Sequence, residues 1–225
     1  MPAALLLDIE GTTTSISFVY DSLFPYARER MRDFLSERFD DPEVRADVAR
    51  LGDGTAADAE AAATLALALM DGDVKDTGLK ALQGRIWASG YASGALRGHV
   101  FADVPDALRE LRRLEIPVHI YSSGSVAAQK LLFGHSEAGD LTPLLSGYFD
   151  TTTGPKKDPL SYRAIAAAIG RGPASVLFVT DSLAEARAAR DARLQVAVSV
   201  RPGNPVLPDH DFRVVTSLAE LLVTH

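Results

Sequence analysis

Short apolar runs alternate with longer amphipathic segments along most of the chain. The first run, residues 4–7, is Ala-Leu-Leu-Leu, and a continuously apolar run is typical of a strand that a parallel sheet buries on both faces. Similar runs predict further strands at residues 116–121, 148–150, 175–180, 195–200 and 212–215. Helical patterns lie between these runs, at residues 104–114, 126–133, 161–169 and from Asp181 to about Arg193. Strands that alternate with helices indicate right-handed βαβ units and a parallel sheet.

The stretch that follows the first strand has a different pattern, which predicts helices and no strand. Helices are expected at residues 17–38, from Pro42 onward, at residues 55–70 and at residues 79–87. The last of these is predicted to end at Ser89-Gly90-Tyr91, because glycine commonly interrupts a helix.

These patterns predict an α/β protein with a Rossmann-like parallel sheet and a second, helical domain. The catalytic core is expected to comprise residues 1–14 and 98–225, with a helical cap of residues 15–97 inserted after the first strand. An insert at that point would hang over the carboxyl end of the sheet. Such a position suits a lid that closes on substrate and excludes water.

Two acidic residues, Asp8 and Glu10, come directly after the first strand. On an extended backbone their side chains would point the same way, and Gly11 then ends the strand. Open α/β sheets bind their ligands at the carboxyl ends of strands, and two carboxylates crowded there repel each other unless a positive group lies between them. The pattern indicates a metal site, with residues 12–14, three threonines, as an anion cradle. A turn or helix-cap role is the plainer alternative.

Polar groups recur at three later places along the chain. They are, in order, Ser122 with Ser123, Lys156 with Lys157, and Asp181 with Glu185 one helical turn further on. Hydroxyls at a helix start can bind an anion, and an ammonium suits a phosphate. Glu185 could reach toward a metal-bound water or cap its helix electrostatically. Taken singly, the serines are also explained as turn formers, the lysines as a solvated pair and the acids as caps.

Taken together, these groups describe one kind of chemistry. Asp8, Glu10 and Asp181 are oxygen ligands with no histidine or cysteine nearby in the sequence, a set that suits Mg²⁺. Hydroxyls with Lys156 suit a phosphate. The sequence therefore predicts metal-assisted phosphoryl transfer to a carboxylate nucleophile.

Composition narrows the class of protein further. The net charge of −7 gives no basic surface for nucleic acid, and the absence of cysteine excludes disulfides, thiolate nucleophiles and cysteine metal sites. No apolar stretch approaches the roughly 18 residues of a membrane span, and no basic leader precedes the first strand. We therefore expect a cytoplasmic protein without a nucleic-acid or membrane partner. A monomer is expected, because no heptad pattern demands a second chain.

The four polar groups match, in order, the motifs of a known superfamily. Asp8-Ile9-Glu10-Gly11-Thr12, Ser122-Ser123, Lys156 and Asp181 resemble the four motifs of the haloacid-dehalogenase-like hydrolases. Longer matches resemble the acireductone synthases, the bifunctional enolase-phosphatases of methionine salvage. They lie in both core and insert, at residues 8–13, 23–27, 79–84, 96–100, 121–135 and 147–151. The chain departs from that family at Ser182, where an apolar residue is common, and in its alanine- and arginine-rich residues 184–189.

The resemblance implies a reaction and a role for each matching residue. The family enolises 2,3-diketo-5-methylthiopentyl-1-phosphate and then removes phosphate, giving 1,2-dihydroxy-3-keto-5-methylthiopentene, with Mg²⁺ as cofactor. Asp8 would be the nucleophile and a metal ligand, Glu10 an acid/base that also binds the metal through its backbone carbonyl, and Asp181 a further metal ligand. Substrate would be bound by Ser122, Ser123 and Lys156, of which Lys156 would also steady Asp8, with Lys157 as its less favoured neighbour.

Several alternatives stay open at this point. The base for enolisation is assigned to Glu10, with His99 and residues of the insert as candidate helpers. An apolar pocket for the methylthio tail is sought among Phe18, Tyr20, Trp87 and Tyr91, although core packing is the favoured explanation for each of them. A generic Mg²⁺-dependent small-molecule phosphatase of the same superfamily is the main alternative function. A metal-free dehalogenase would not need Glu10, and a non-enzymatic binding module would not need all four groups.

Overall fold

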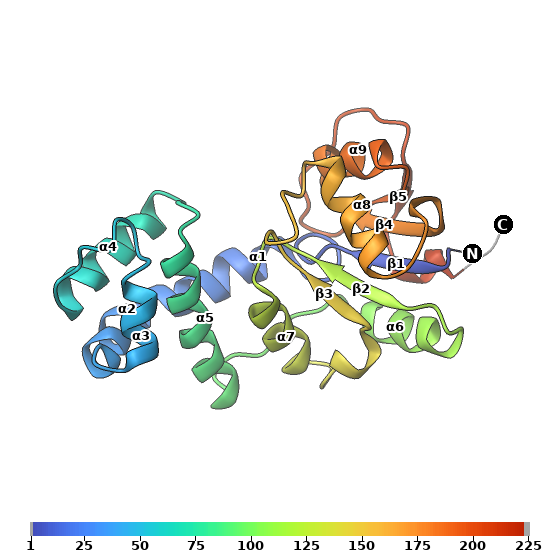
Figure 1. The fold of residues 1–225 in the computed structure, drawn as a ribbon. Coiled ribbons are helices and arrows are strands. Elements are labelled where there is room, and N and C mark those ends of the chain that lie inside the picture. Colours follow the sequence, from blue (N-terminus) through green and yellow to red (C-terminus); the bar gives the residue numbers. More distant parts are fainter. Residues whose placement is uncertain (1, 223–225) are drawn as a thin grey trace. The chain divides into compact units, whose positions relative to one another are not determined.

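The computed structural model describes residues 2–222 and divides the chain into two compact units (Figure 1). Residues 1–18 and 97–225 form the core unit, and residues 19–96 form the helical unit. The division after Phe18 lies slightly later than the expected end of the first core segment at residue 14. That the helical unit acts as a cap is still a prediction.

A parallel sheet organises the core unit, with strand order β3-β2-β1-β4-β5-β6. The strands are β1 (Ala4–Leu7), β2 (Val118–Tyr121), β3 (Gly147–Phe149), β4 (Val176–Thr180), β5 (Gln195–Ser199) and β6 (Arg213–Val215). In the register of the central strand, Leu7 pairs with Ile120 on one side and with Val179 on the other. The residues that follow β1, β2 and β4 therefore meet at one edge of the sheet.

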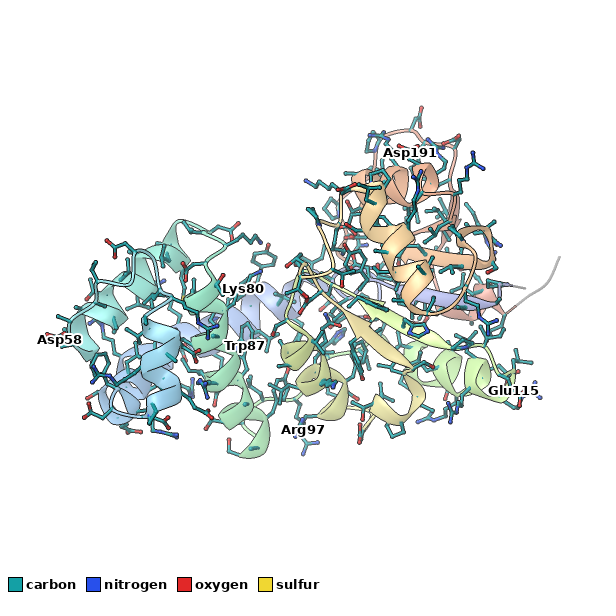
Figure 2. All side chains as sticks on the ribbon, viewed as in Figure 1. Asp58, Lys80, Trp87, Arg97, Glu115 and Asp191 are labelled. Atoms are coloured by element: carbon teal, nitrogen blue, oxygen red, sulfur yellow. The ribbon has the colours of Figure 1, made fainter. Side chains whose placement is uncertain are left out.

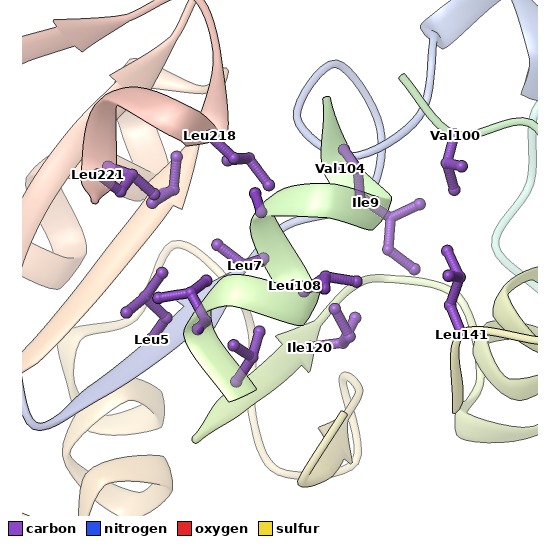
Figure 3. Close-up of a cluster of buried hydrophobic side chains, with 14 of the residues drawn as sticks. Leu5, Leu7, Ile9, Val100, Val104, Leu108, Ile120, Leu141, Leu218 and Leu221 are labelled. Atoms are coloured by element: carbon purple, nitrogen blue, oxygen red, sulfur yellow. The ribbon is translucent and has the colours of Figure 1, made fainter. Parts of the chain in front are cut away.

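Helices cover both faces of this sheet. They are α6 (Val104–Arg113), α7 (Val126–Gly134), α8 (Pro159–Ala168) and α9 (Leu183–Asp191), with the short α1 (Ile16–Phe18) and the 3₁₀ turns η2 (Thr142–Leu144), η3 (Pro173–Ser175) and η4 (Leu218–Leu221). Side chains of β1 alternate between the two layers: Leu5 and Leu7 pack with Leu108 of α6 (Figure 3), whereas Leu6 packs with Ile165 of α8. Burial on both faces explains the unbroken apolar run, and the predicted strands and Rossmann-like α/β class are confirmed.

The helical unit has a hydrophobic core of its own. It contains the π-helical turn η1 (Val19–Leu23), α2 (Phe24–Arg38), α3 (Pro42–Val48), α4 (Ala59–Asp71) and α5 (Thr77–Ala92). Aspartates at positions 41, 58 and 76 accept hydrogen bonds from the first turns of α3, α4 and α5, which fixes the starts of these helices. Exposed charges, such as Asp58 here and Asp191 in the core unit, lie on the outside of each unit (Figure 2). Within residues 2–222, no helix is long and apolar enough to cross a membrane.

Two of the differences from the predicted helices of this unit have a visible structural form. The helix expected at residues 17–38 is interrupted by η1, and α5 continues through Ser89-Gly90-Tyr91 to Ala92. A Cβ atom on Gly90 would lie 2.7 Å from the Tyr26 ring and 2.8 Å from Leu96. Glycine at this position therefore permits close packing inside the helix and does not end it.

The chain leaves and re-enters the core unit at adjacent points. Thr14 Oγ1 lies 3.0 Å from His99 Nδ1, the Ser15 N–H donates to the same nitrogen, and the Phe101 N–H donates to the Thr13 carbonyl at 3.0 Å. These bonds join the two segments of the core unit directly, and none of them involves residues 19–96.

Candidate active site

Asp8 lies immediately after the central strand and is almost fully buried. Its N–H continues the sheet by donating to the Val179 carbonyl at 2.9 Å. Oδ1 accepts hydrogen bonds from the Ile9 N–H at 2.7 Å and from Lys156 Nζ at 2.6 Å, and Oδ2 lies 3.2 Å from Thr180 Oγ1. A buried carboxylate needs such compensation, and here it also fixes the orientation of the group.

Lys156 stands between two carboxylates. Its Nζ lies 2.6 Å from Asp8 Oδ1 and 2.8 Å from Glu185 Oε2, and only about 10% of the side chain is exposed. Burial lowers the pKa of Lys156, but the negative charges of Asp8 and Glu185 outweigh it and hold that pKa above its usual value. Lys157 is exposed, so of the two lysines Lys156 is the one that joins the buried group.

Asp181 follows β4 and packs against the backbone of the first loop. A Cβ atom on Gly11, whose φ is +66°, would lie 2.2 Å from Asp181 Oδ2, so only glycine leaves room for this carboxylate. Burial and the charge of Asp8 raise the pKa of Asp181 to about 7, with Lys156 opposing the shift and Glu10 adding to it. The half-buried Glu10 therefore lies close enough to act on Asp181 through its charge.

Glu185 belongs to the buried ionic group, a place that neither sequence-based interpretation assigned to it. Besides Lys156 it contacts Thr180 Oγ1 at 2.9 Å, and Ser182 provides the N-cap of α9. The hydroxyl of Thr180 has one proton for both Asp8 and Glu185. Burial and the charge of Asp8 raise the pKa of Glu185 to about 7. Ser182, at which the chain departs from the family, is thus the N-cap of the helix that carries Glu185.

The three threonines do not form the expected anion cradle. The N–H groups of Thr12, Thr13 and Thr14 all donate to the Ile9 carbonyl, at 2.9–3.2 Å, and all three residues are fully buried. These donors are used within the loop and are not available to a phosphate. The three threonine N–H groups therefore shape the backbone after Asp8 and are not presented to an anion.

Ser122 and Ser123 follow β2 at the same sheet edge as Asp8. Ser122 is buried, and its hydroxyl accepts from the Gly124 N–H at 3.1 Å; Ser123 is half-buried. Gln129, which the sequence did not single out, donates from Nε2 to the carbonyls of Gly124 and Phe149 at 2.8 Å each. Within residues 2–222, the structure brings Asp8, Lys156 and Glu185 into one hydrogen-bonded group that does not include the Ser122 side chain.

A second brace on the first loop was also missed by sequence reasoning. Arg201 Nε donates to the Thr12 carbonyl at 3.0 Å, and Asn204 Nδ2 donates to the Gly11 carbonyl at 2.9 Å. Arg201 is buried and also bonds Asp103 Oδ1 at 2.9 Å. No motif or spacing marks these residues in the sequence, because their function in the fold depends on contacts across nearly the whole chain.

The donor set around Asp8 fits a hard divalent cation. The carboxylates of Asp8 and Asp181, together with the Glu10 charge, exceed the single ammonium of Lys156, and this excess adds to burial in raising the pKa of Asp181. Among residues 2–222, no three histidine or acidic side chains gather closely enough to form a ligand cluster by themselves. A cation here would therefore rely on two side-chain carboxylates, a backbone carbonyl such as that of Glu10, and water.

Comparison with known proteins identifies the family and the fold of this chain. Residues 2–193 match the family model for haloacid dehalogenase-like hydrolases. The chain is 51% identical to enolase-phosphatase E1 of Synechococcus elongatus over 96% of each chain, and 47% identical to that of Drosophila melanogaster over 91% of this chain and 86% of the relative. The crystal structure of the UTR4 protein of Saccharomyces cerevisiae superimposes with a TM-score of 0.85 at 36% identity, covering 96% of this chain and 98% of that one.

The fold and the site define a haloacid dehalogenase-like hydrolase. The chain belongs to that family and, within it, to the family of the enolase-phosphatase E1 proteins. The family and the fold class predicted from the sequence are thereby confirmed.

Proposed function

We propose that this chain catalyses the Mg²⁺-dependent enolase-phosphatase reaction of methionine salvage. It converts 2,3-diketo-5-methylthiopentyl-1-phosphate to 1,2-dihydroxy-3-keto-5-methylthiopentene and phosphate. The observation that carries the proposal is the buried Asp8 carboxylate, held between the Lys156 ammonium and the Thr180 hydroxyl at the end of the central strand. Support for the substrate comes from the names of relatives about half identical over nearly the full chain.

In the phosphatase step Asp8 attacks phosphorus. A bond forms between its carboxylate oxygen and phosphorus while the bond from phosphorus to the substrate's C1 oxygen breaks, and water later hydrolyses the aspartyl phosphate. Lys156 stands 2.6 Å from the nucleophile and compensates negative charge as the phosphoryl group arrives. The leaving oxygen takes a proton, for which Glu10 is the assigned donor. Ser122 and Ser123, at the end of the neighbouring strand, are assigned to substrate binding.

We assign the cofactor Mg²⁺ to Asp8, Asp181 and the backbone carbonyl of Glu10. When bound, the ion would neutralise charge on the nucleophile and on the phosphate. The fit rests on an all-oxygen donor set, on the excess of negative charge that, with burial, raises the pKa of Asp181 to about 7, and on the glycine at position 11 that admits the Asp181 carboxylate.

The geometry favours Glu10 over His99 as the base for enolisation. His99 Nδ1 accepts a hydrogen bond from the Ser15 N–H at 3.2 Å, so a neutral ring carries its proton on Nε2. Neither nitrogen then has a free lone pair with which to take a proton from carbon. Glu10 is half-buried, and its charge acts on the neighbouring Asp181.

The nucleophile is tested by the substitution Asp8→Asn. We expect kcat for phosphate release to fall by about 10⁴-fold or more, because the amide cannot form the phosphoryl bond. Release of phosphate is measured with and without Mg²⁺, and thermal unfolding checks that the variant is folded. Asp191→Asn, at an exposed carboxylate on α9, is the control and should keep wild-type activity. Substantial turnover by Asp8→Asn, or full wild-type activity in excess chelator, would contradict the proposal.

The substrate is tested in the same assay by comparing the diketone phosphate with common sugar phosphates. We expect kcat/KM to be higher for the diketone phosphate by at least about 10²-fold, since binding energy from the rest of the substrate is used at the reacting centre. Equal turnover of all of them would instead favour a generic phosphatase.

A further inference from the structure

The loop that carries Lys156 has an unusual pattern of hydrogen bonds. Three successive carbonyl groups each accept a hydrogen bond from a side-chain hydroxyl: Gly154 from Tyr121 at 2.9 Å, Pro155 from Ser161 at 2.8 Å and Lys156 from Tyr162 at 2.5 Å. One donor comes from β2 and two come from the first turn of α8. The backbone before and at the lysine is thus fixed from two elements of the core unit.

The three donors are themselves held rigidly. Tyr121 and Tyr162 are fully buried, their rings meet edge to face at 5.5 Å, and Tyr162 also packs on Phe178 of β4. Ser161 is buried as well, and a Cβ atom on Gly154 would lie 2.2 Å from its hydroxyl oxygen. The loop backbone is therefore in close contact with the hydroxyl groups that bond it, and it has no space to move toward them.

The side chain of Lys156 is placed by this backbone. Its Nζ lies 5.8 Å from the centre of the Tyr121 ring and within 2.8 Å of both Asp8 and Glu185. A lysine side chain has four rotatable bonds, so an ammonium that must meet two carboxylates depends on a fixed starting point. A shift of the loop by an ångström would lengthen both contacts.

We propose that the hydroxyls of Tyr121, Ser161 and Tyr162 are positioning groups for Lys156, which set the place of its ammonium between Asp8 and Glu185. The proposal rests on the proposed function, in which Lys156 acts on the phosphate and on Asp8. It assigns a part in catalysis to residues that do not touch substrate. A purely structural part, in which the hydroxyls only satisfy buried carbonyl groups, is the alternative that the experiment must exclude.

The test removes one hydroxyl at a time and leaves the packing in place. Tyr121→Phe, Ser161→Ala and Tyr162→Phe are made singly and together, and kcat, KM and the thermal midpoint are measured for each. The matched control is Tyr148→Phe, because the Tyr148 hydroxyl is buried yet has no hydrogen-bond partner within residues 2–222. Both the diketone phosphate and p-nitrophenyl phosphate are used as substrates.

We expect Tyr162→Phe to lower kcat about tenfold and the triple variant about 10²-fold, with KM changed less than twofold, because a misplaced group costs most in the transition state. The control should keep kcat within twofold. A triple variant with wild-type kcat, or one that raises KM while kcat is unchanged, would overturn the proposal. So would a loss of kcat that the control shares.

The two substrates separate this proposal from the proposed function. A wild-type enzyme that hydrolyses p-nitrophenyl phosphate but not the diketone phosphate would contradict the assigned substrate. The ratios of variant to wild-type kcat with p-nitrophenyl phosphate would still decide the role of the three hydroxyls, since Lys156 acts on phosphate in either case.

Discussion

At the scale of single residues, one ammonium compensates more than one carboxylate. Lys156 is in direct contact with Asp8 and Glu185, and its charge also opposes the rise in the pKa of Asp181, which packs against Gly11. Burial and mutual repulsion therefore raise the pKa values of Asp181 and Glu185 to about 7. In the absence of a divalent cation this part of the protein is under electrostatic strain at neutral pH.

The stability of the metal-free protein should reflect this strain. A carboxyl group whose pKa is higher in the folded state than in the unfolded state keeps its proton in the folded protein after the unfolded chain has lost it. Stability therefore falls as pH rises from about 4 to about 7, and the change levels off above the folded-state pKa. We expect the thermal midpoint of metal-free protein to fall between pH 5 and pH 8 and the fall to be smaller in Asp181→Asn. Mg²⁺ should raise the midpoint more at pH 8 than at pH 6, because binding requires the ionised carboxylate.

Thermal unfolding at several pH values, with and without Mg²⁺, checks this prediction. Asp140→Asn is the control, because the pKa of Asp140 is lowered by its bonds to Thr142 rather than raised. The prediction would be contradicted if Mg²⁺ raised the thermal midpoint equally at pH 6 and pH 8. It would also be contradicted if the midpoint of Asp181→Asn fell with pH as much as that of the wild type.

At the scale of elements, a buried arginine joins loops that are distant in sequence. Arg201 follows β5 and bonds the Thr12 carbonyl after β1, the Thr216 carbonyl after β6, and Asp103 before α6. Asp103 in turn accepts bonds from Ser217 and the Leu218 N–H at the start of η4. The position of the loop after Asp8 is thereby tied to the last strand and the last turn of the sheet.

The substitution Arg201→Lys should destabilise the protein and lower its activity. An ammonium cannot reproduce the fork of donors that meets three acceptors, and we expect a loss of about 2 kcal/mol in the free energy of unfolding with a fall in kcat. Chemical denaturation and steady-state kinetics measure the two effects. Arg190→Lys is the matched control, since its ion pair with Asp211 is exposed and should matter little. Equal effects of the two substitutions on the free energy of unfolding and on kcat would contradict a special role for the buried bonds of Arg201.

The elements themselves were largely predictable from the sequence, and the contacts between them were not. The run Ala4–Leu7 predicts a doubly buried strand because every residue in it is apolar, and both layers against it are now visible. The prediction that the helix ends at Gly90 was wrong, because this glycine lies inside α5 and allows close packing on Tyr26. Lys156 could be predicted from its motif. The roles of Arg201 and of the hydroxyls that bond the Lys156 loop depend on tertiary contacts, which leave no local pattern in the sequence.

At the scale of the whole molecule, the chain has two units, and the sequence of the helical unit is inserted between the two segments of the core unit. The strands, the hydrophobic clusters on the two faces of the sheet and the ionic group around Asp8 all lie in residues 1–18 and 97–225. The helical unit has its own buried cluster, from Ala27 on α2 to Ile86 on α5. Each unit therefore holds the contacts that a compact fold requires.

This arrangement predicts that the core unit folds without residues 19–96. When these residues are replaced by a short glycine-serine linker, we expect a folded protein with a single cooperative thermal transition, because the bonds between Thr14, Ser15 and His99 already join the two segments. If the helical unit is a cap, kcat/KM for the diketone phosphate should fall by at least about 10²-fold, and more than for p-nitrophenyl phosphate. Circular dichroism, thermal unfolding and the phosphate assay check this. Equal losses for both substrates would contradict the cap assignment.

The insertion of the helical unit also determines when the central strand can find its partners during synthesis. β1 leaves the ribosome before the other strands, yet it pairs with β2, which begins at Val118, and with β4, which begins at Val176. At a translation rate of roughly 5–20 residues per second, this apolar strand waits on the order of 10–30 s for both neighbours. The helical unit, whose contacts are local, can fold on the nascent chain in that interval. The first strand of the chain, which ends just before Asp8, would then become stable only after most of the chain has been synthesised.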